Sequence, residues 1–209
     1  MSGDIPLLVV TLTVWAYWLR VGAMVVRARR HEHHDVGVIP ERSAERLLIW
    51  LGYVPLVAAW CALPLLALNH AHGWLAVPSF AEDGIAYPAA RWLGACAVVV
   101  CFVLTLRSWR TMGRNWRMDI SDRNTTLVTS GMFARIRHPI YAFSIAMMLA
   151  TVVVLPTPAM LALAAAHVVL MNVKARNEEA HLARMHGDAY LRYVERTGRF
   201  IPRPAARDS

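Results

Sequence analysis

Long apolar segments separated by polar, arginine-rich segments form the dominant pattern of this chain. An apolar run of about 20 residues is long enough to cross the hydrocarbon core of a bilayer as a helix. Five segments have this character, and the last two are shortish arms of a hairpin around Pro156-Thr157-Pro158: residues 5–26, 47–68, 92–106, 140–155 and 159–172. The pattern therefore predicts an all-α integral membrane protein with about five transmembrane helices.

Composition supports the same conclusion. Of the 209 residues 57% are hydrophobic and only 17% are charged, and the mean hydropathy is +0.39. This is too apolar for an ordinary soluble domain of this size. The first apolar segment follows no basic stretch and ends in no small-residue cleavage site, so we expect a membrane anchor and not a signal peptide.

The arginines predict the orientation of these segments. Residues 27–46 contain five arginines, residues 107–138 contain seven, and eight basic residues follow Asn172, whereas residues 69–90 contain none. Because basic loops stay on the cytoplasmic side, we expect a multi-pass protein of the cell membrane with its N-terminus outside and its C-terminus inside. The net charge of +8 then reflects topology and attraction to anionic lipid headgroups, and no nucleic-acid recognition motif accompanies it.

Candidate chemistry begins in the basic stretch 125–141, which ends against the apolar segment that starts at Ile140. Proline is well tolerated in the first turn of a helix, so we expect Pro139 to start a helix with His138 at its mouth. The free N–H groups and the dipole of that turn attract an anionic group. The alternative is an ordinary basic loop beside the membrane.

A second polar cluster follows the last apolar segment. On a helix Lys174 and Glu178 are four residues apart, Arg176 and Glu179 are three apart, and each pair shares a face. Two surface ion pairs would explain this spacing. The cluster nevertheless lies where the fifth helix leaves the membrane, facing the loop of His138. A carboxylate there can hold the hydroxyl or amino groups of a nucleoside cofactor, and a cation can hold an acidic substrate.

Two further stretches have simpler interpretations. Asp188 is expected to cap a second short, amphipathic helix, which lies at the membrane interface, closes the site against water, or does both. The stretch His31-Glu32-His33-His34-Asp35 offers metal-binding side chains, but their crowded spacing in a polar loop favours a solvated loop over a metal site.

Together the two polar clusters resemble the isoprenylcysteine carboxyl methyltransferase family, whose wider relatives are phospholipid N-methyltransferases. The resemblance runs from about Arg110 to Pro202 and includes Gly113-Arg114-Asn115-Trp116, Leu182, Gly187, Tyr190, Tyr193 and Ile201-Pro202. It divides the chain into three N-terminal transmembrane helices within residues 1–106 and a catalytic region over residues 107–209.

The resemblance implies transfer of a methyl group from S-adenosylmethionine to a lipophilic or prenylated acceptor that arrives from the membrane lipid, with carboxyl O-methylation as the expected reaction and no metal. The cofactor contacts of the family fall on Thr125, Thr126, Leu127, Val128, Phe133, His138, Pro139, Ile140, Tyr141 and Glu178. The family's substrate-orienting arginine falls on Lys174, and Arg176 and Glu179 are the other expected catalytic residues. An amine or thiol acceptor would have to lose a proton, with His138 or Glu179 as the nearest bases.

Three positions depart from the family pattern, two of them at expected cofactor contacts and one at the expected substrate contact. Thr125 stands in place of His, Phe133 in place of Tyr, and Lys174 in place of Arg. An ammonium group does not offer the planar fork that a guanidinium gives a carboxylate, so Lys174 bears on the acceptor. A phospholipid, amine or thiol methyltransferase, an NADPH-dependent membrane reductase of the sterol type, and a non-enzymatic scaffold or sensor remain the alternatives.

Overall fold

The computed structural model describes residues 4–31, 47–69, 75–79, 84–113 and 126–203. Within these ranges the chain is helical, and its one extended pairing is an isolated bridge between Ile136 and Gly198. The predicted all-α fold is therefore confirmed. The main helices are α1 (Ile5–His31), α3 (Val54–Asn69), α5 (Tyr87–Met112), α6 (Pro139–Val154), α7 (Pro158–His186) and α8 (Asp188–Arg196).

All five apolar segments form helices. Four helical stretches are long and apolar enough to cross a membrane: Ile5–Arg27, Ile49–Asn69, Tyr87–Met112 and Pro158–His186. The fifth apolar helix, α6, has 16 residues and so measures about 24 Å, which is shorter than a hydrocarbon core of about 30 Å. Helix α5 is longer at both ends than residues 92–106, since it starts at Tyr87 beside Pro88 and ends at Met112.

A π-helical turn, Leu48–Tyr53, leads directly into α3. Pro55 follows this turn, and a proline ring in an α-helix clashes with the carbonyl group four residues earlier. The wider π turn gives the backbone room at that carbonyl. The turn also ends on Tyr53, whose ring reaches the site described below.

Helices α5 and α6 pack closely because Gly94 lies at their contact. A Cβ atom on Gly94 would lie 2.9 Å from Val154 Cγ2 and 3.1 Å from the carbonyl oxygen of Ala150. Small residues allow the backbones of membrane helices to approach in this way. Helix α6 is thus fixed between α5 on one side and α7 on the other.

Polar contacts between helix ends show which ends share a side of the bundle. Asp4, at the start of α1, forms an ion pair with Arg91 near the start of α5. Arg91 also donates through Nε to the carbonyl oxygen of Val154, the last residue of α6, at 3.2 Å. The last turns of α1 and α5 and the first turn of α6 consequently lie at the other end of the bundle.

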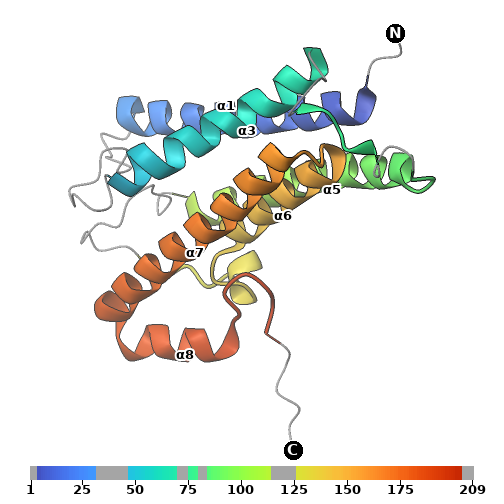
Figure 1. Ribbon diagram of the computed structural model, residues 1–209. Helices are drawn as coiled ribbons and strands as arrows, with labels where there is room; N and C mark the ends of the chain where they lie inside the picture. Colours follow the sequence, from blue (N-terminus) through green and yellow to red (C-terminus); the bar gives the residue numbers. More distant parts are fainter. Residues whose placement is uncertain (1–3, 32–46, 70–74, 80–83, 114–125, 204–209) are drawn as a thin grey trace, which may run out of the picture.

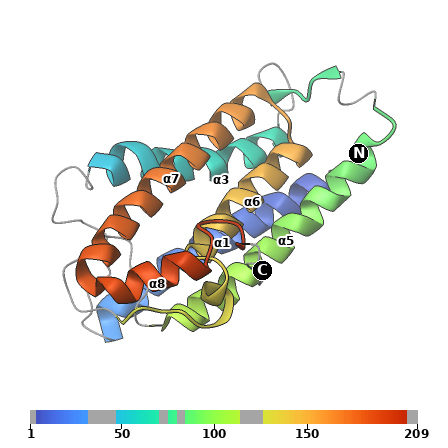
Figure 2. The same cartoon turned by 90° about the horizontal axis from the view of Figure 1, so that it is seen from below.

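Helix α7 extends beyond the bundle at that other end. Its 29 residues measure about 43 Å, more than the thickness of a hydrocarbon core. The chain then turns back, and α8 runs below the bundle, as Figures 1 and 2 show. The cap of α8 is Gly187, with φ of 50°, and not Asp188 as predicted. Gly187 also ends α7 by donating to the carbonyl oxygen of Ala183, so one glycine with a positive φ serves both helices.

Candidate functional site

The loop that enters α6 is anchored from below by α8. It contains a 3₁₀ turn, Gly131–Ala134, in which Phe133 is buried. Gly131 has φ of 60°, and a side chain there would meet Thr111 of α5 at 3.3 Å. The Tyr193 hydroxyl of α8 donates to the Phe133 carbonyl oxygen at 2.7 Å. Burial raises the pKa of Tyr193 to about 12, so its hydroxyl keeps the proton for this bond.

The end of the chain pairs with the same loop. We call residues 197–203 the C-terminal strap. The Arg137 amide donates to the Gly198 carbonyl oxygen at 2.8 Å, the His138 amide donates to that of Arg199 at 3.1 Å, and the Gly198 amide donates to that of Arg135 at 3.1 Å. These bonds hold the strap beside the residues that lead into α6, under the bundle in Figure 1.

His138 stands at the mouth of α6, which begins at Pro139 as predicted. Its side chain is 5% exposed, with Nδ1 at 3.3 Å from Glu178 Oε2 and Nε2 at 3.4 Å from Glu179 Oε1. The second contact has an ion-pair distance but not the geometry of a hydrogen bond. Burial alone would lower the pKa of His138, but the Glu178 and Glu179 carboxylates outweigh it and raise the pKa above its usual value.

Glu178 is held by the first turn of α6 but remains open to solvent. The Tyr141 hydroxyl donates to Glu178 Oε1, and the Tyr141 ring stacks on the His138 ring with centroids 5.4 Å apart. Because the Glu178 side chain keeps 28% of its surface exposed, this carboxylate can still accept hydrogen bonds from a ligand.

Glu179 lies beside Glu178 but has different partners. Arg137 Nε donates to Glu179 Oε1 at 3.1 Å, while Arg199 donates through Nε to Oε1 at 3.0 Å and through Nη2 to Oε2 at 2.5 Å. The interpretation as a surface pair with Arg176 was therefore wrong for this carboxylate. Arg176 is exposed. Glu179 instead faces the loop that enters α6 and the strap, where its two arginine partners lie.

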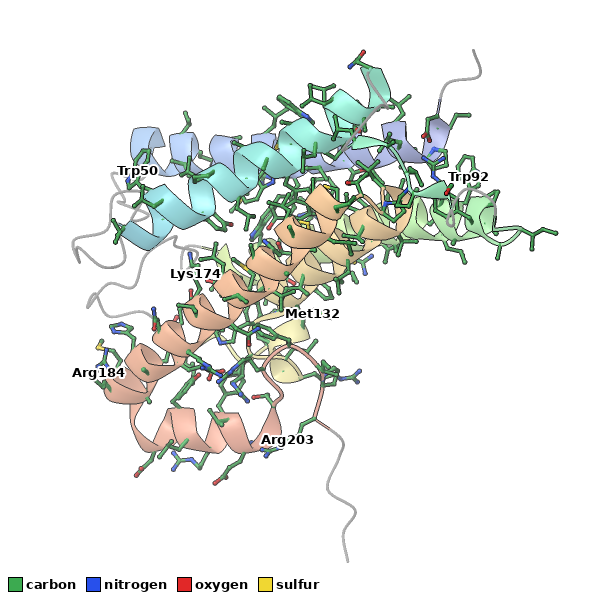
Figure 3. All side chains as sticks on the ribbon, viewed as in Figure 1. Trp50, Trp92, Met132, Lys174, Arg184 and Arg203 are labelled. Carbon is green, nitrogen blue, oxygen red and sulfur yellow. The ribbon has the colours of Figure 1, made fainter. Side chains whose placement is uncertain are left out.

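Lys174 enters the site from α7 one turn before Glu178. The residue is buried, with 8% of its surface exposed. Its Nζ atom lies 5.2 Å from the centroid of the Tyr53 ring and 6.0 Å from that of Tyr141. These are cation–π distances. In Figure 3 Lys174 lies below the level of α1 and α3 and above α8.

The structure thus brings together five predicted site residues that are far apart in the sequence: His138, Tyr141, Lys174, Glu178 and Glu179. Pro139 is buried in the first turn of α6, and Ile140 is half-buried. Leu127 and Val128 are half-buried, while Thr126 is exposed. Thr125 and residues 114–116 lie outside the described residues. The roles of these residues in binding and catalysis stay predictions.

Four site residues were absent from the predicted set: Tyr53, Arg137, Arg199 and Phe200. The rings of Phe200 and His138 lie with centroids 6.2 Å apart. The sequence held one signal for this part of the site, because Arg199-Phe200 stands directly before the Ile201-Pro202 pair of the resemblance. Among the described residues no three possible metal ligands lie together; residues 32–35 of the histidine-rich stretch fall outside them.

Comparisons with known proteins agree with this fold and with the region that holds the site. Residues 89–189, just under half of the chain, match the family described as phospholipid methyltransferase. The cobalt-zinc-cadmium resistance protein CzcN of Cupriavidus metallidurans is 31% identical over 135 residues, and the match covers 62% of each chain.

Among solved structures, the eukaryotic intramembrane Ras methyltransferase, isoprenylcysteine carboxyl methyltransferase, has the same fold. The TM-score is 0.50 at 15% sequence identity, and the match covers 94% of this chain and 97% of the other. The resemblance predicted from the two polar clusters is confirmed, and both the matched family and this structural neighbour are methyltransferases.

Proposed function

We propose that this chain, whose residues 89–189 match a methyltransferase family, is an integral membrane methyltransferase that uses S-adenosylmethionine and acts on a lipophilic, isoprenylcysteine-like acceptor. The observation that carries the proposal is the meeting of His138 and Tyr141, at the mouth of α6, with the adjacent carboxylates of α7. The site lies at the end of the bundle that holds the last turn of α5 and the first turn of α6. The arginine-rich segments of the sequence predict that this end faces the cytoplasm.

The residues at the site fit the chemical groups of the proposed cofactor. Glu178 presents a partly exposed carboxylate, which can accept hydrogen bonds from ribose hydroxyls or from an amino group. The first turn of α6 directs backbone N–H groups and the positive end of a helix dipole toward an anionic group such as a carboxylate. Bound S-adenosylmethionine would supply a methyl group on a positively charged sulfur atom, and Glu178 and the α6 turn would hold it.

The partners of the acidic residues and of His138 favour an acceptor that arrives already ionised. Both oxygens of Glu179 accept bonds from guanidinium groups. His138 lies between two carboxylates that favour its protonated form. Neither side chain is suited to take a proton at neutral pH. A carboxylate acceptor needs no such step, because carboxylic acids are ionised at pH 7. This supports carboxyl O-methylation over methylation of a thiol or an ammonium group.

Among the described residues, Lys174 is the one best placed to receive a carboxylate acceptor. Its ammonium group lies at the membrane side of the site, next to the rings of Tyr53 and Tyr141. A buried cation there attracts an anionic headgroup, while the apolar tail of the acceptor stays among the transmembrane helices. The chemistry assigned to the site is then positioning: the acceptor oxygen and the methyl group are aligned, and water is excluded.

Calorimetric titration of the purified protein with S-adenosylhomocysteine, the product form of the cofactor, tests the cofactor assignment without knowledge of the acceptor. We expect saturable binding that Glu178→Gln weakens at least tenfold, as expected when hydrogen bonds to a charged group are lost. Glu195→Gln is the matched control, because Glu195 is an exposed carboxylate of α8. Binding of NADPH and not of S-adenosylhomocysteine by the folded protein would replace this proposal with a reductase.

A second experiment tests the acceptor. We expect methyl transfer to a prenylated cysteine with a free carboxylate and none to the corresponding amide, and Lys174→Met should raise KM for the acid more than it lowers kcat. The phospholipid methyltransferase family match makes an amine headgroup the second candidate. Transfer to phosphatidylethanolamine vesicles, with none to the prenylated acid, would assign that acceptor instead.

A further inference from the structure

Arg199 makes two hydrogen bonds to Glu179, although it comes from the C-terminal strap and not from a transmembrane helix. Its guanidinium group donates to both oxygens of the Glu179 carboxylate. Two parallel bonds of this kind fix both the position and the orientation of a carboxylate. The orientation of Glu179 also sets the contact of its Oε1 atom with His138 Nε2.

The strap is itself held rigidly next to His138. Besides its backbone bonds to residues 135–138, Gly198 lies where no side chain fits, because a Cβ atom there would be 1.7 Å from the carbonyl oxygen of Ile201. Phe200 packs its ring against that of His138. Arg199, which lies between these two residues, is therefore directed at Glu179 by the backbone on both sides.

We propose that Arg199 is a positioning residue of the cofactor site, which acts through Glu179 on the His138 ring and makes residues 198–200 of the strap part of that site. This inference rests on the proposed function for its binding assay. It goes beyond that function because it assigns a role to a residue outside the expected cofactor-binding and catalytic residues.

The charged and titratable groups around His138 determine what loss of Arg199 would do. Helix α7 contributes Glu178 and Glu179, the entry loop contributes Arg137, and the strap contributes Arg199. Tyr141 stacks on the ring, Tyr190 of α8 interacts with Glu179, and Lys174 interacts with Glu178. Removing the Arg199 cation leaves the two carboxylates less neutralised, so the pKa of His138 should rise further.

The test is a titration of purified Arg199→Met, Arg199→Lys and Arg203→Met with S-adenosylhomocysteine. Arg199→Met should bind about tenfold more weakly, which is in the range for a residue that acts on a site through intervening contacts, and Arg199→Lys should recover part of that loss. Arg203 is the matched control, because it lies in the same strap but donates to the carbonyl oxygens of Val194 and Glu195. Equal losses in Arg199→Met and Arg203→Met would overturn the inference.

A pH series of thermal unfolding separates this inference from the proposed function, because it needs no ligand. A raised pKa of His138 stabilises the fold at low pH, and this contribution disappears as the pH rises through the folded-state pKa. In Arg199→Met the stabilisation by protonated His138 should be lost at a higher pH than in the wild type. Arg203→Met should lose it at the same pH as the wild type. A purely structural Arg199 would lower stability at every pH without moving the transition. Absence of S-adenosylhomocysteine binding together with a shifted transition would reject the function but keep the positioning role.

Discussion

Two buried histidines, 29 residues apart in the chain, sit in opposite electrostatic surroundings. His138, at the mouth of α6, faces a carboxylate with each ring nitrogen. His167, in the apolar half of α7, shares a 3.0 Å hydrogen bond with the Ser144 hydroxyl through Nε2. Its other nitrogen has no hydrogen-bond partner among the described residues, and its ring packs against Trp60 with centroids 5.2 Å apart.

This difference separates a functional cluster from polar packing inside a membrane bundle. Around His138 the charges come from three separate parts of the chain: the entry loop, α7 and the strap. Around His167 the partners are neutral, and a neutral imidazole is the form that an apolar environment tolerates at the lowest cost. Both histidines are thus buried, but of the two only His138 is surrounded by paired charges.

The largest loss of stability should come from removing Glu179, the carboxylate that Arg137 and Arg199 share. Glu179→Ala would leave the Arg137 and Arg199 guanidinium groups without their shared carboxylate, and Arg137 is only 11% exposed. We expect a loss of about 2–4 kcal/mol in the free energy of unfolding, because a poorly solvated cation without its partner is unfavourable. Chemical denaturation in detergent micelles measures this loss.

Glu195→Ala provides the control for this variant, since Glu195 is exposed on α8 and should change the free energy of unfolding by less than about 0.5 kcal/mol. Equal stability of Glu179→Ala and Glu195→Ala would mean that the guanidinium groups find water or other acceptors easily. The contrast between a charged cluster and neutral packing would then have no energetic basis.

What the sequence could predict also differs between the apolar bundle and the charged site. The apolar segments were predictable because length and hydrophobicity alone decide which stretches can span a bilayer. Pro139 marked the start of α6 because proline favours the first helical turn. The spacing of Lys174, Arg176, Glu178 and Glu179 gave the faces of one helix but not the partners that other elements bring to it.

Arg199 and Tyr53 show why those partners could not be predicted. Arg199 reaches Glu179 only because Gly187 reverses the chain and the strap returns to the entry loop. Tyr53 is more than 100 residues from Lys174 in the sequence, and its place near that ammonium group follows from the π turn and the packing of α3 on α7. Neither arrangement has a local sequence pattern that specifies it.

The pH dependence of stability should differ between the two histidines. Because the pKa of His138 is raised, its protonated form stabilises the fold below the unfolded-state pKa of about 6.5, and this contribution is lost as the pH rises through the folded-state value. We expect the melting temperature of the wild type to fall as the pH rises from about 6.5 through the folded-state pKa of His138. His138→Asn should flatten the profile, whereas His167→Asn should keep it. A profile that is flat in the wild type would contradict the assignment of a protonated His138.

The smallest loss of stability should come from a substitution at His167, whose partners are neutral. His167→Leu removes the hydrogen bond to Ser144 but fills the same volume with an apolar side chain. Interhelical hydrogen bonds of this kind in membrane proteins contribute about 0.6 kcal/mol on average, so the variant should unfold at nearly the wild-type denaturant concentration. Its affinity for S-adenosylhomocysteine should stay within about twofold of the wild type, because no charged group of the site contacts His167. A large loss of affinity with unchanged stability would show instead that the contacts of Ser144 and His167 inside the bundle control the geometry at the mouth of α6, and that the site extends into the membrane.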